Sequence, residues 1–171
     1  MKLFTNWPRP RRLPWLLAIA AVVALADRFT KMWVVAHVRY GDVLPVIPRV
    51  LGISHWTNEG AAFSAFADSS RPDAVRWGLI AFTVVAALAV LAVLIRFGNR
   101  ITLATVALAL VLGGALGNLH DRIAYGAVID FVEVNIFSYH YPDFNLADSA
   151  IVIGACLLFL DSLLPERKSA V

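Results

Sequence analysis

The chain has 171 residues, of which 60% are hydrophobic and 16% are charged, and it carries a formal net charge of +3. A soluble domain of this length does not need so much apolar surface, so the composition indicates a protein of the lipid bilayer. The basic residues lie at the chain ends and in short turns, without interleaved aromatic residues, so no nucleic acid partner is expected. The length fits one domain, which we assign to residues 1–171.

Four apolar runs are long enough to cross a bilayer as helices. At about 1.5 Å per residue, a run of about 20 residues covers a hydrocarbon core roughly 30 Å thick. We expect spans at about 13–33, 74–95, 101–121 and 144–164. Glycines within them provide small faces where helices can approach closely.

The first run also has the outline of a cleavable secretory signal. Four basic residues precede it, and its apolar stretch reaches Ala24-Leu25-Ala26. Such a signal would be removed from the mature protein. The apolar pattern continues past Asp27, however, and a retained helix gives an even number of spans with a consistent charge bias. We therefore interpret this run as a retained helix.

The Lys and Arg residues predict the orientation of the spans. Residues 1–12 carry four of them, the turn 96–100 carries two and the C-terminal tail carries two more. Short segments rich in Lys and Arg stay in the cytoplasm, so both termini are expected there. Residues 34–73 and 122–143 are then outside.

The outer segments carry patterns that differ from those of the spans. Residues 41–56 combine Val, Ile, Pro and Gly as in short strands and turns, and 128–137 alternates loosely like a strand. Residues 57–66 suit a turn that leads into a short helix on the membrane surface. The predicted fold is therefore an all-α membrane protein with four transmembrane helices, a small extracytoplasmic β-rich cradle and a short interfacial helix.

Ten of the twelve acidic residues fall on the predicted outer side. Most have the ordinary interpretation of solvated groups or helix caps. Asp27, Asp121, Asp130 and Asp148 differ because they adjoin apolar spans. An ionised carboxylate in that position costs about 2.5 to 3.5 kcal/mol even on lenient scales. These four residues are therefore candidates for a functional site.

Two aspartates held close together in a low-dielectric pocket share a proton, because both cannot ionise easily. One can then activate water while the other protonates a carbonyl, which hydrolyses a peptide without a covalent intermediate. Asp130 and Asp148 flank one outer loop and can meet. The residues alone do not select this pair over Asp121 with Asp148, and they leave Glu133 and Asp143 as further partners.

Other hydrolytic chemistry has weaker support. The chain lacks a G-x-S-x-G elbow, and Ser64 has no evident histidine partner. The H-E-x-x-H motif is also absent, and the histidine spacing is unspecific, so no metal site is expected. Cys156 lies within an apolar run and is interpreted as a packing residue. No motif indicates a cofactor.

Four segments together resemble the lipoprotein signal peptidases, the bacterial signal peptidase II family. They are residues 27–31, 58–64, 113–131 and 144–149. Their order and spacing match those of the family, and with the spans between them they cover nearly the whole chain. Any one segment would be weak evidence, whereas four in register are highly specific.

The resemblance implies which aspartates react. In the family, the aspartates of G-x-V-x-D-F and F-N-x-A-D form the catalytic dyad, and the matching positions here are Asp130 and Asp148. The residues that it implies as supports for the dyad or the substrate are Asp27, Lys31, Asn58, Gly60, Asn118, Asp121, Arg122 and Asn145. We interpret Asp121, paired with Arg122, as structural, and Lys31 also fits a simple anchor at the interface. Asp143, two residues before Asn145, receives no predicted role.

The resemblance also implies the activity. The family consists of membrane aspartic endopeptidases that cleave the signal peptide from prolipoproteins on the N-terminal side of a diacylglyceryl-modified cysteine. The implied partners are these precursors and membrane lipids, with the enzyme acting as a monomer. The implied location is the bacterial inner membrane, with the active site at the periplasmic face. Residues 41–70 are expected to cradle or clamp the substrate.

Two other functions could use the same residues. A proton-coupled transporter or channel would relay protons through aspartates in the membrane. Transporters usually place such groups near the midplane within repeated halves, whereas here they gather at one face and no repeat is present. A non-enzymatic chaperone would bind lipidated peptides in the same groove. Substitution of Asp130 or Asp148 by Asn distinguishes these functions from peptide hydrolysis.

Overall fold

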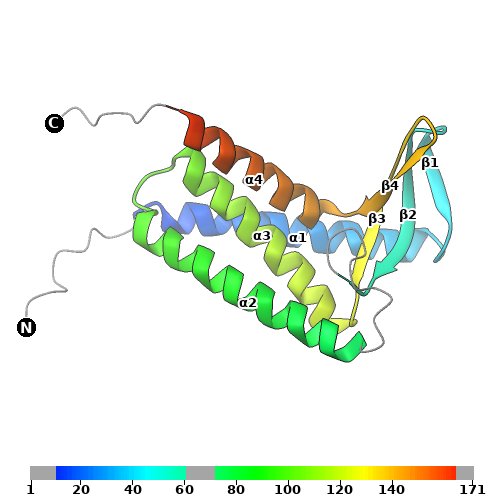
Figure 1. Cartoon of the computed structure of the whole chain (residues 1–171), viewed down its shortest axis with the longest axis horizontal. Helices are drawn as coiled ribbons and strands as arrows, with labels where there is room; N and C mark the ends of the chain where they lie inside the picture. Colours follow the sequence, from blue (N-terminus) through cyan, green and yellow to red (C-terminus); the bar gives the residue numbers. More distant parts are fainter. Residues whose placement is uncertain (1–10, 61–71, 165–171) are drawn as a thin grey trace, which may run out of the picture.

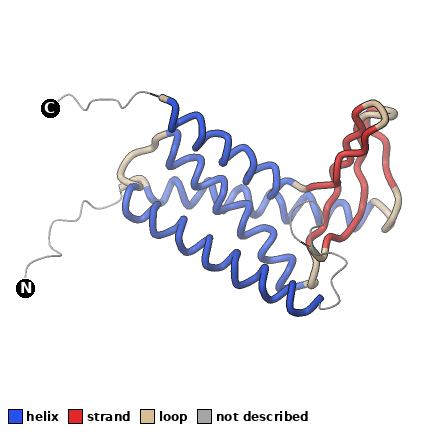
Figure 2. The backbone as a smooth tube through the Cα atoms, in the orientation of Figure 1, coloured by secondary structure: helices blue, strands red, loops and turns tan. Residues whose placement is uncertain are grey.

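The computed structural model describes residues 11–60 and 72–164 of the chain. Its helices are α1 (Leu13–His37), α2 (Pro72–Phe97), α3 (Leu103–Ala124) and α4 (Leu146–Leu163). Its strands are β1 (Val43–Ile47), β2 (Leu51–Asn58), β3 (Val128–Ile136) and β4 (Tyr139–Phe144). The helices form one elongated bundle, and the strands form a sheet at one end of it (Figures 1 and 2). All four helices are long and apolar enough to cross a membrane. The predicted class of fold is confirmed.

Helix α3 is the centre of the bundle. It packs against α1, α2 and α4. Half of the residues in its apolar stretch are buried, compared with 17% in each of the other helices. Close approach depends on glycine: a Cβ at Gly113 would lie 2.6 Å from the carbonyl oxygen of Ala20, and one at Gly154 would lie 2.7 Å from that of Ala107. Side chains on the outer faces, such as Phe82 and Phe159, are exposed and suit contact with lipid.

The sheet is antiparallel with strand order β1-β2-β3-β4. Trp56 pairs with Asp130 across β2 and β3, and the register of those strands shifts between Ile53 and Trp56. The register of β3 and β4 also shifts, between Val132 and Val134. Both irregularities lie close to the junction with the helices.

A small apolar cluster fixes the sheet to the bundle. Val34 and Val38, at the end of α1, are buried against Phe131 of β3. Helix α1 therefore continues to His37, four residues beyond its expected end, because its last turn packs beneath the sheet. Helices α1 and α4 respectively begin and end at the far end of the bundle from the sheet (Figure 1).

The other predicted boundaries differ by a few residues. Helix α2 extends two residues further at each end than expected, and α3 ends at Ala124 rather than near 121. The predicted strands in 41–56 and 128–137 are present as β1, β2 and β3. Thr57 and Asn58 end β2 instead of beginning a turn. The rest of the expected interfacial helix falls mainly on 61–71, outside the described residues.

Candidate active site

The polar site lies where the bundle meets the sheet. Helices α1 and α3 end there, β3 passes across, and α4 begins. One connected network of hydrogen bonds and ion pairs joins all ten residues that the sequence singled out. They come from α1, β2, α3, β3 and the start of α4, with Gly60 just beyond the end of β2. The network therefore assembles residues that are up to 121 positions apart, since 148 minus 27 is 121.

Asn145 connects the two aspartates of the expected dyad. It is the N-cap of α4, and its backbone is extended, so its side chain can accept a 2.9 Å hydrogen bond from the backbone N–H of Asp148. Its backbone N–H donates to Asp148 Oδ2 at 3.3 Å, which completes a capping box. Its side-chain Nδ2 donates to Asp130 Oδ1 at 2.7 Å. One fully buried residue thus holds both carboxylates.

Asp130 lies on β3 and is only 4% exposed. Its second oxygen accepts a 3.3 Å hydrogen bond from Asn58 Nδ2. Burial, followed by the negative charge of Asp148, raises the pKa of Asp130 to about 7, against the opposing effects of Asn145, Asn58 and Lys31. Asp130 therefore retains its proton in a substantial fraction of molecules near neutral pH.

Asp148 has a different environment. Its Oδ1 accepts a 2.7 Å hydrogen bond from Asn118 Nδ2, and its Oδ2 accepts one from the backbone of Asn145. It also lies in the first turn of α4, where the helix dipole stabilises negative charge. Asp148 is part-exposed, whereas Asp130 is buried. Asp148 therefore has a hydrogen-bond donor on each oxygen and is accessible to solvent.

A buried ion cluster supports Asn118. Lys31 Nζ lies 2.8 Å from Asp27 Oδ2 and 2.8 Å from Asp121 Oδ2, and all three side chains are at most 1% exposed. Lys31 also donates to Asn118 Oδ1 at 3.1 Å. Because Oδ1 of Asn118 faces Lys31, its Nδ2 faces Asp148, so the lysine determines which amide atom meets the catalytic candidate.

Two interpretations made from the sequence are wrong. Lys31 is fully buried in the ion cluster, so it is not a simple anchor at the membrane interface. Asp121 has an ion pair with Lys31, not the expected one with its neighbour Arg122. The error about Asp121 has a simple cause: adjacent helical residues point about 100° apart, so neighbours in sequence seldom pair. The structural interpretation of Asp121 remains a prediction.

The ion cluster also holds the residue that precedes each aspartate of the expected dyad. Asp27 Oδ1 accepts a 2.9 Å hydrogen bond from the backbone of Ala147, and Asp121 Oδ2 accepts one of 3.3 Å from Ile129. Gly117, which the sequence indicated only as a packing residue, makes room for Asp27: a Cβ there would lie 2.6 Å from Asp27 Oδ2. Gly117 lies one helical turn before Asp121 on α3, and this glycine so close to a candidate carboxylate was the available signal in the sequence.

Arg122 and Gly60 form the edge of the network. Arg122 Nη2 donates to the carbonyl oxygen of Gly60 at 3.0 Å, and the backbone N–H of Gly60 donates to Asn58 Oδ1 at 2.9 Å. The guanidinium also interacts electrostatically with Asp148 and Asp130. The remainder of the motif that begins at Asn58 lies beyond residue 60, outside the described residues. Among the residues described, no cluster of three His, Cys, Asp or Glu side chains could hold a metal ion.

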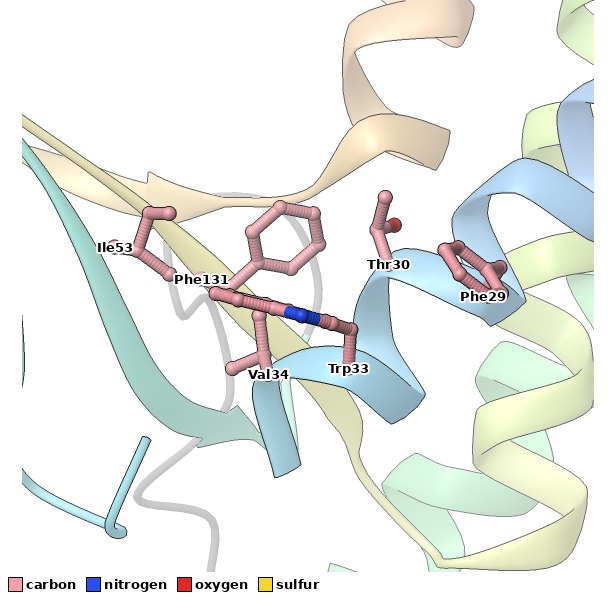
Figure 3. Close-up of a pocket in the computed structure, with 6 residues that line it drawn as sticks. All are labelled: Phe29, Thr30, Trp33, Val34, Ile53 and Phe131. Atoms are coloured by element: carbon pink, nitrogen blue, oxygen red, sulfur yellow. The ribbon is translucent and has the colours of Figure 1, made fainter. Parts of the chain in front are cut away.

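An apolar pocket lies between α1 and strands β2 and β3 (Figure 3). Its volume is about 290 Å³. Its lining residues are Phe29, Thr30, Trp33, Val34, Ile53 and Phe131. Phe131 of the lining follows Asp130 on β3, so the two side chains point to opposite faces of that strand. Phe29 and Trp33 are also exposed on the outer surface of α1.

Comparisons with known proteins agree with the motifs. The family model described as signal peptidase (SPase) II matches residues 19–164. The lipoprotein signal peptidase of Paraburkholderia phytofirmans is 46% identical over 91% of this chain and 88% of its own length. That of Acinetobacter baumannii is 41% identical over 93% of this chain and 88% of its own length. A bacterial membrane enzyme solved by the in meso method has a TM-score of 0.78 at 32% identity, covering 88% of each chain. The chain belongs to the signal peptidase II family.

Proposed function

We propose that Asp130 and Asp148 are the catalytic dyad of this membrane aspartic endopeptidase, which cleaves signal peptides from prolipoproteins. The observation that carries the proposal is their asymmetry across Asn145. Asp130 is buried with a pKa of about 7, whereas Asp148 is part-exposed at a helix N-terminus with hydrogen-bond donors on both oxygens. A buried carboxyl group with a raised pKa is suited to act as the acid, and the neighbouring carboxyl group that solvent can reach is suited to act as the base.

The division of labour follows from that asymmetry. Asp148, as the carboxylate, takes a proton from water while that water attacks the scissile carbonyl carbon. Asp130, as the acid, donates its proton to the carbonyl oxygen, so the tetrahedral intermediate is a neutral gem-diol. Asp148 then gives its new proton to the amide nitrogen while a hydroxyl of the gem-diol returns a proton to Asp130. The C–N bond breaks, which releases the signal peptide with a carboxyl end and leaves the lipidated cysteine with a free amine. Asn145 and Asn118 hold the carboxyl groups in place throughout, and the guanidinium of Arg122 offsets the negative charge of the pair.

The proposed substrate carries a diacylglyceryl group on the cysteine that follows the cleaved bond. Its acyl chains remain in the membrane, so the dyad must lie at the membrane edge. The pocket of about 290 Å³ between α1 and the sheet supports this requirement, because it is apolar and lies at the same end of the bundle as Asp130. We assign it to one of the acyl chains because Phe29 and Trp33, which line it, are also exposed on the outer surface of α1, where lipid can reach them. The other chain then contacts bulk lipid.

The proposed location is the bacterial inner membrane with the sheet in the periplasm. Arg11, Arg12, Arg96 and Arg100 lie at the beginning of α1 and around the connection between α2 and α3. That end of the bundle is opposite the sheet (Figure 1). The positive-inside rule then assigns it, with both termini, to the cytoplasm. We also propose a monomer, because one chain supplies all ten residues of the network.

Substitution of each aspartate by asparagine tests the dyad. Asp130→Asn and Asp148→Asn should each lower kcat for precursor cleavage at least about 10²-fold, because each removes one proton-transfer group. The matched control is Asp161→Asn, near the other end of α4, which should retain activity. Precursor binding, measured by copurification, should persist in both dyad variants. Cleavage by either variant at the rate of the control would refute the assignment.

A further inference from the structure

The sheet contains a second buried polar contact, outside the four motifs that identified the family. Ser54 of β2 is fully buried, and its hydroxyl donates to Asp143 Oδ2 at 2.5 Å. Asp143 lies on β4, and its side chain is 9% exposed. Its other oxygen lies 3.3 Å from Nε2 of His140. The mechanism above uses none of these three residues.

Burial of the Asp143 carboxylate costs free energy, so it requires polar or charged partners in a defined geometry. Burial raises the pKa of Asp143, and the nearby Glu133 of β3 acts in the same direction. Ser54 and His140 oppose that effect by donating to the carboxylate or by carrying positive charge. Because the loss of the Ser54 hydroxyl would leave the buried Oδ2 of Asp143 without a hydrogen-bond donor, the contact constrains where Asp143 can lie.

The contact joins two strands that are not neighbours. The sheet order is β1-β2-β3-β4, so the bond from Ser54 to Asp143 crosses over β3. It does so where the backbone ladders are irregular: the register shifts between Ile53 and Trp56 on one side of β3, and between Val132 and Val134 on the other. Regular ladder bonds are disrupted at such shifts, so this side-chain bond provides the connection there.

Both ends of the contact lie close in sequence to residues that hold Asp130. Asp143 precedes Asn145 by two residues, and Asn145 donates to Asp130 while capping the helix that carries Asp148. Ser54 precedes Asn58 by four residues on β2, and Asn58 donates to the other oxygen of Asp130. A displacement of β4 relative to β2 would therefore move both donors to Asp130.

We propose that Asp143 is a positioning residue for the dyad: through Ser54 it fixes β4 to β2 and so sets the geometry of Asn145 and Asn58 around Asp130. The inference rests on the proposed dyad. It assigns to Asp143 a role in kcat rather than in substrate affinity, because the buried contact of Asp143 with Ser54 acts on Asp130 through Asn145 and Asn58. Misplacement by about 1 Å can cost up to 10²-fold in rate.

The test uses the full-length enzyme in lipid bilayers with a diacylated precursor. Ser54→Ala and Asp143→Ala should each lower kcat roughly tenfold with KM changed less than about twofold. The double variant should be no slower than the slower single variant, because both changes remove one contact. Asp143→Asn retains an acceptor oxygen for the Ser54 hydroxyl and should recover most of kcat. Ser162→Ala, whose hydroxyl bonds within α4, is the matched control.

Three results would overturn the inference: an unchanged kcat, a loss confined to KM, or multiplicative losses in the double variant. If Asp143→Ala does not fold, Ser54→Ala and Asp143→Asn suffice, because only the first should lower kcat. Asp130→Asn and Asp148→Asn, assayed in parallel, test the dyad separately. Activity in those variants would refute the proposed function, whereas their inactivity with an unaffected Ser54→Ala would refute only the role of Asp143.

Discussion

Replacement of Lys31 by methionine should destabilise the protein severely. Lys31 is fully buried between Asp27 and Asp121, at 2.8 Å from each, and both carboxylates are about 1% exposed. Methionine has a similar volume but no charge, so the variant would leave two buried carboxylates without their cation. Removal of one partner from a buried ion pair costs about 3–5 kcal/mol. For a chain of this size, that corresponds to a fall of roughly 6–20 °C in the unfolding midpoint.

The compensating variant separates charge from packing. Asp27→Asn and Asp121→Asn, added to Lys31→Met, remove all three charges, so the triple variant should regain most of the lost stability. It should not regain activity, because Asn118 no longer has a cation that orients its amide toward Asp148. Thermal unfolding in detergent micelles, followed by circular dichroism, and precursor cleavage in bilayers measure the two effects.

Two results would contradict the role assigned to Lys31, and a third would contradict its effect on Asn118. If Lys31→Met unfolds at the temperature of the wild type, the buried cluster does not contribute the expected energy. If the triple variant is no more stable than the single variant, then the lysine stabilises the fold by filling space and not by neutralising the carboxylates. Recovery of both stability and kcat in the triple variant would show that Asn118 keeps its orientation without Lys31.

Three further predictions concern the reaction, the packing and the pocket. Because the pKa of Asp130 is about 7 and its protonated form is the proposed acid, kcat/KM should fall as pH rises through about 7. Asn58→Ala removes a hydrogen bond that lowers the pKa of Asp130, so it should move this fall to higher pH. Gly117→Ala should cost about 1–3 kcal/mol in thermal unfolding, because its Cβ would lie 2.6 Å from Asp27 Oδ2, whereas Gly78→Ala, with open space, should cause no loss. Trp33→Ala should raise KM for long-chain diacylated precursors more than for short-chain ones, since each buried methylene contributes about 0.8 kcal/mol; equal effects on both would argue against an acyl chain in the pocket.

The sequence was sufficient for the spans, because a fixed hydrocarbon thickness demands a fixed length of apolar helix. It was less accurate at the helix ends, which depend on tertiary contacts. Residues 34–37 remain helical because Val34 packs against Phe131, nearly a hundred positions away. No local pattern reports such a contact.

The network was predictable as a set of residues but not as a set of contacts. The motifs singled out Lys31 and Asp121, yet their pairing depends on how α1 and α3 rotate against each other. The contact from Ser54 to Asp143 could not be predicted either, because it crosses β3 at two register shifts that no local sequence pattern indicates. Side chains that meet through packing must be found in the fold.

Asp148 has two roles that one substitution can separate. As the third residue of α4, its carboxylate accepts from the backbone of Asn145 and completes the capping box, so the proposed base also helps to begin the helix. Asp148→Ala removes both roles and should cost about 1 kcal/mol of stability as well as activity. Asp148→Asn keeps an oxygen that can accept from Asn145 but turns its amide nitrogen toward Asn118, so it should lose less stability than Asp148→Ala while losing cleavage. Equal unfolding midpoints for the alanine and asparagine variants would show that the capping bond adds nothing to the start of α4.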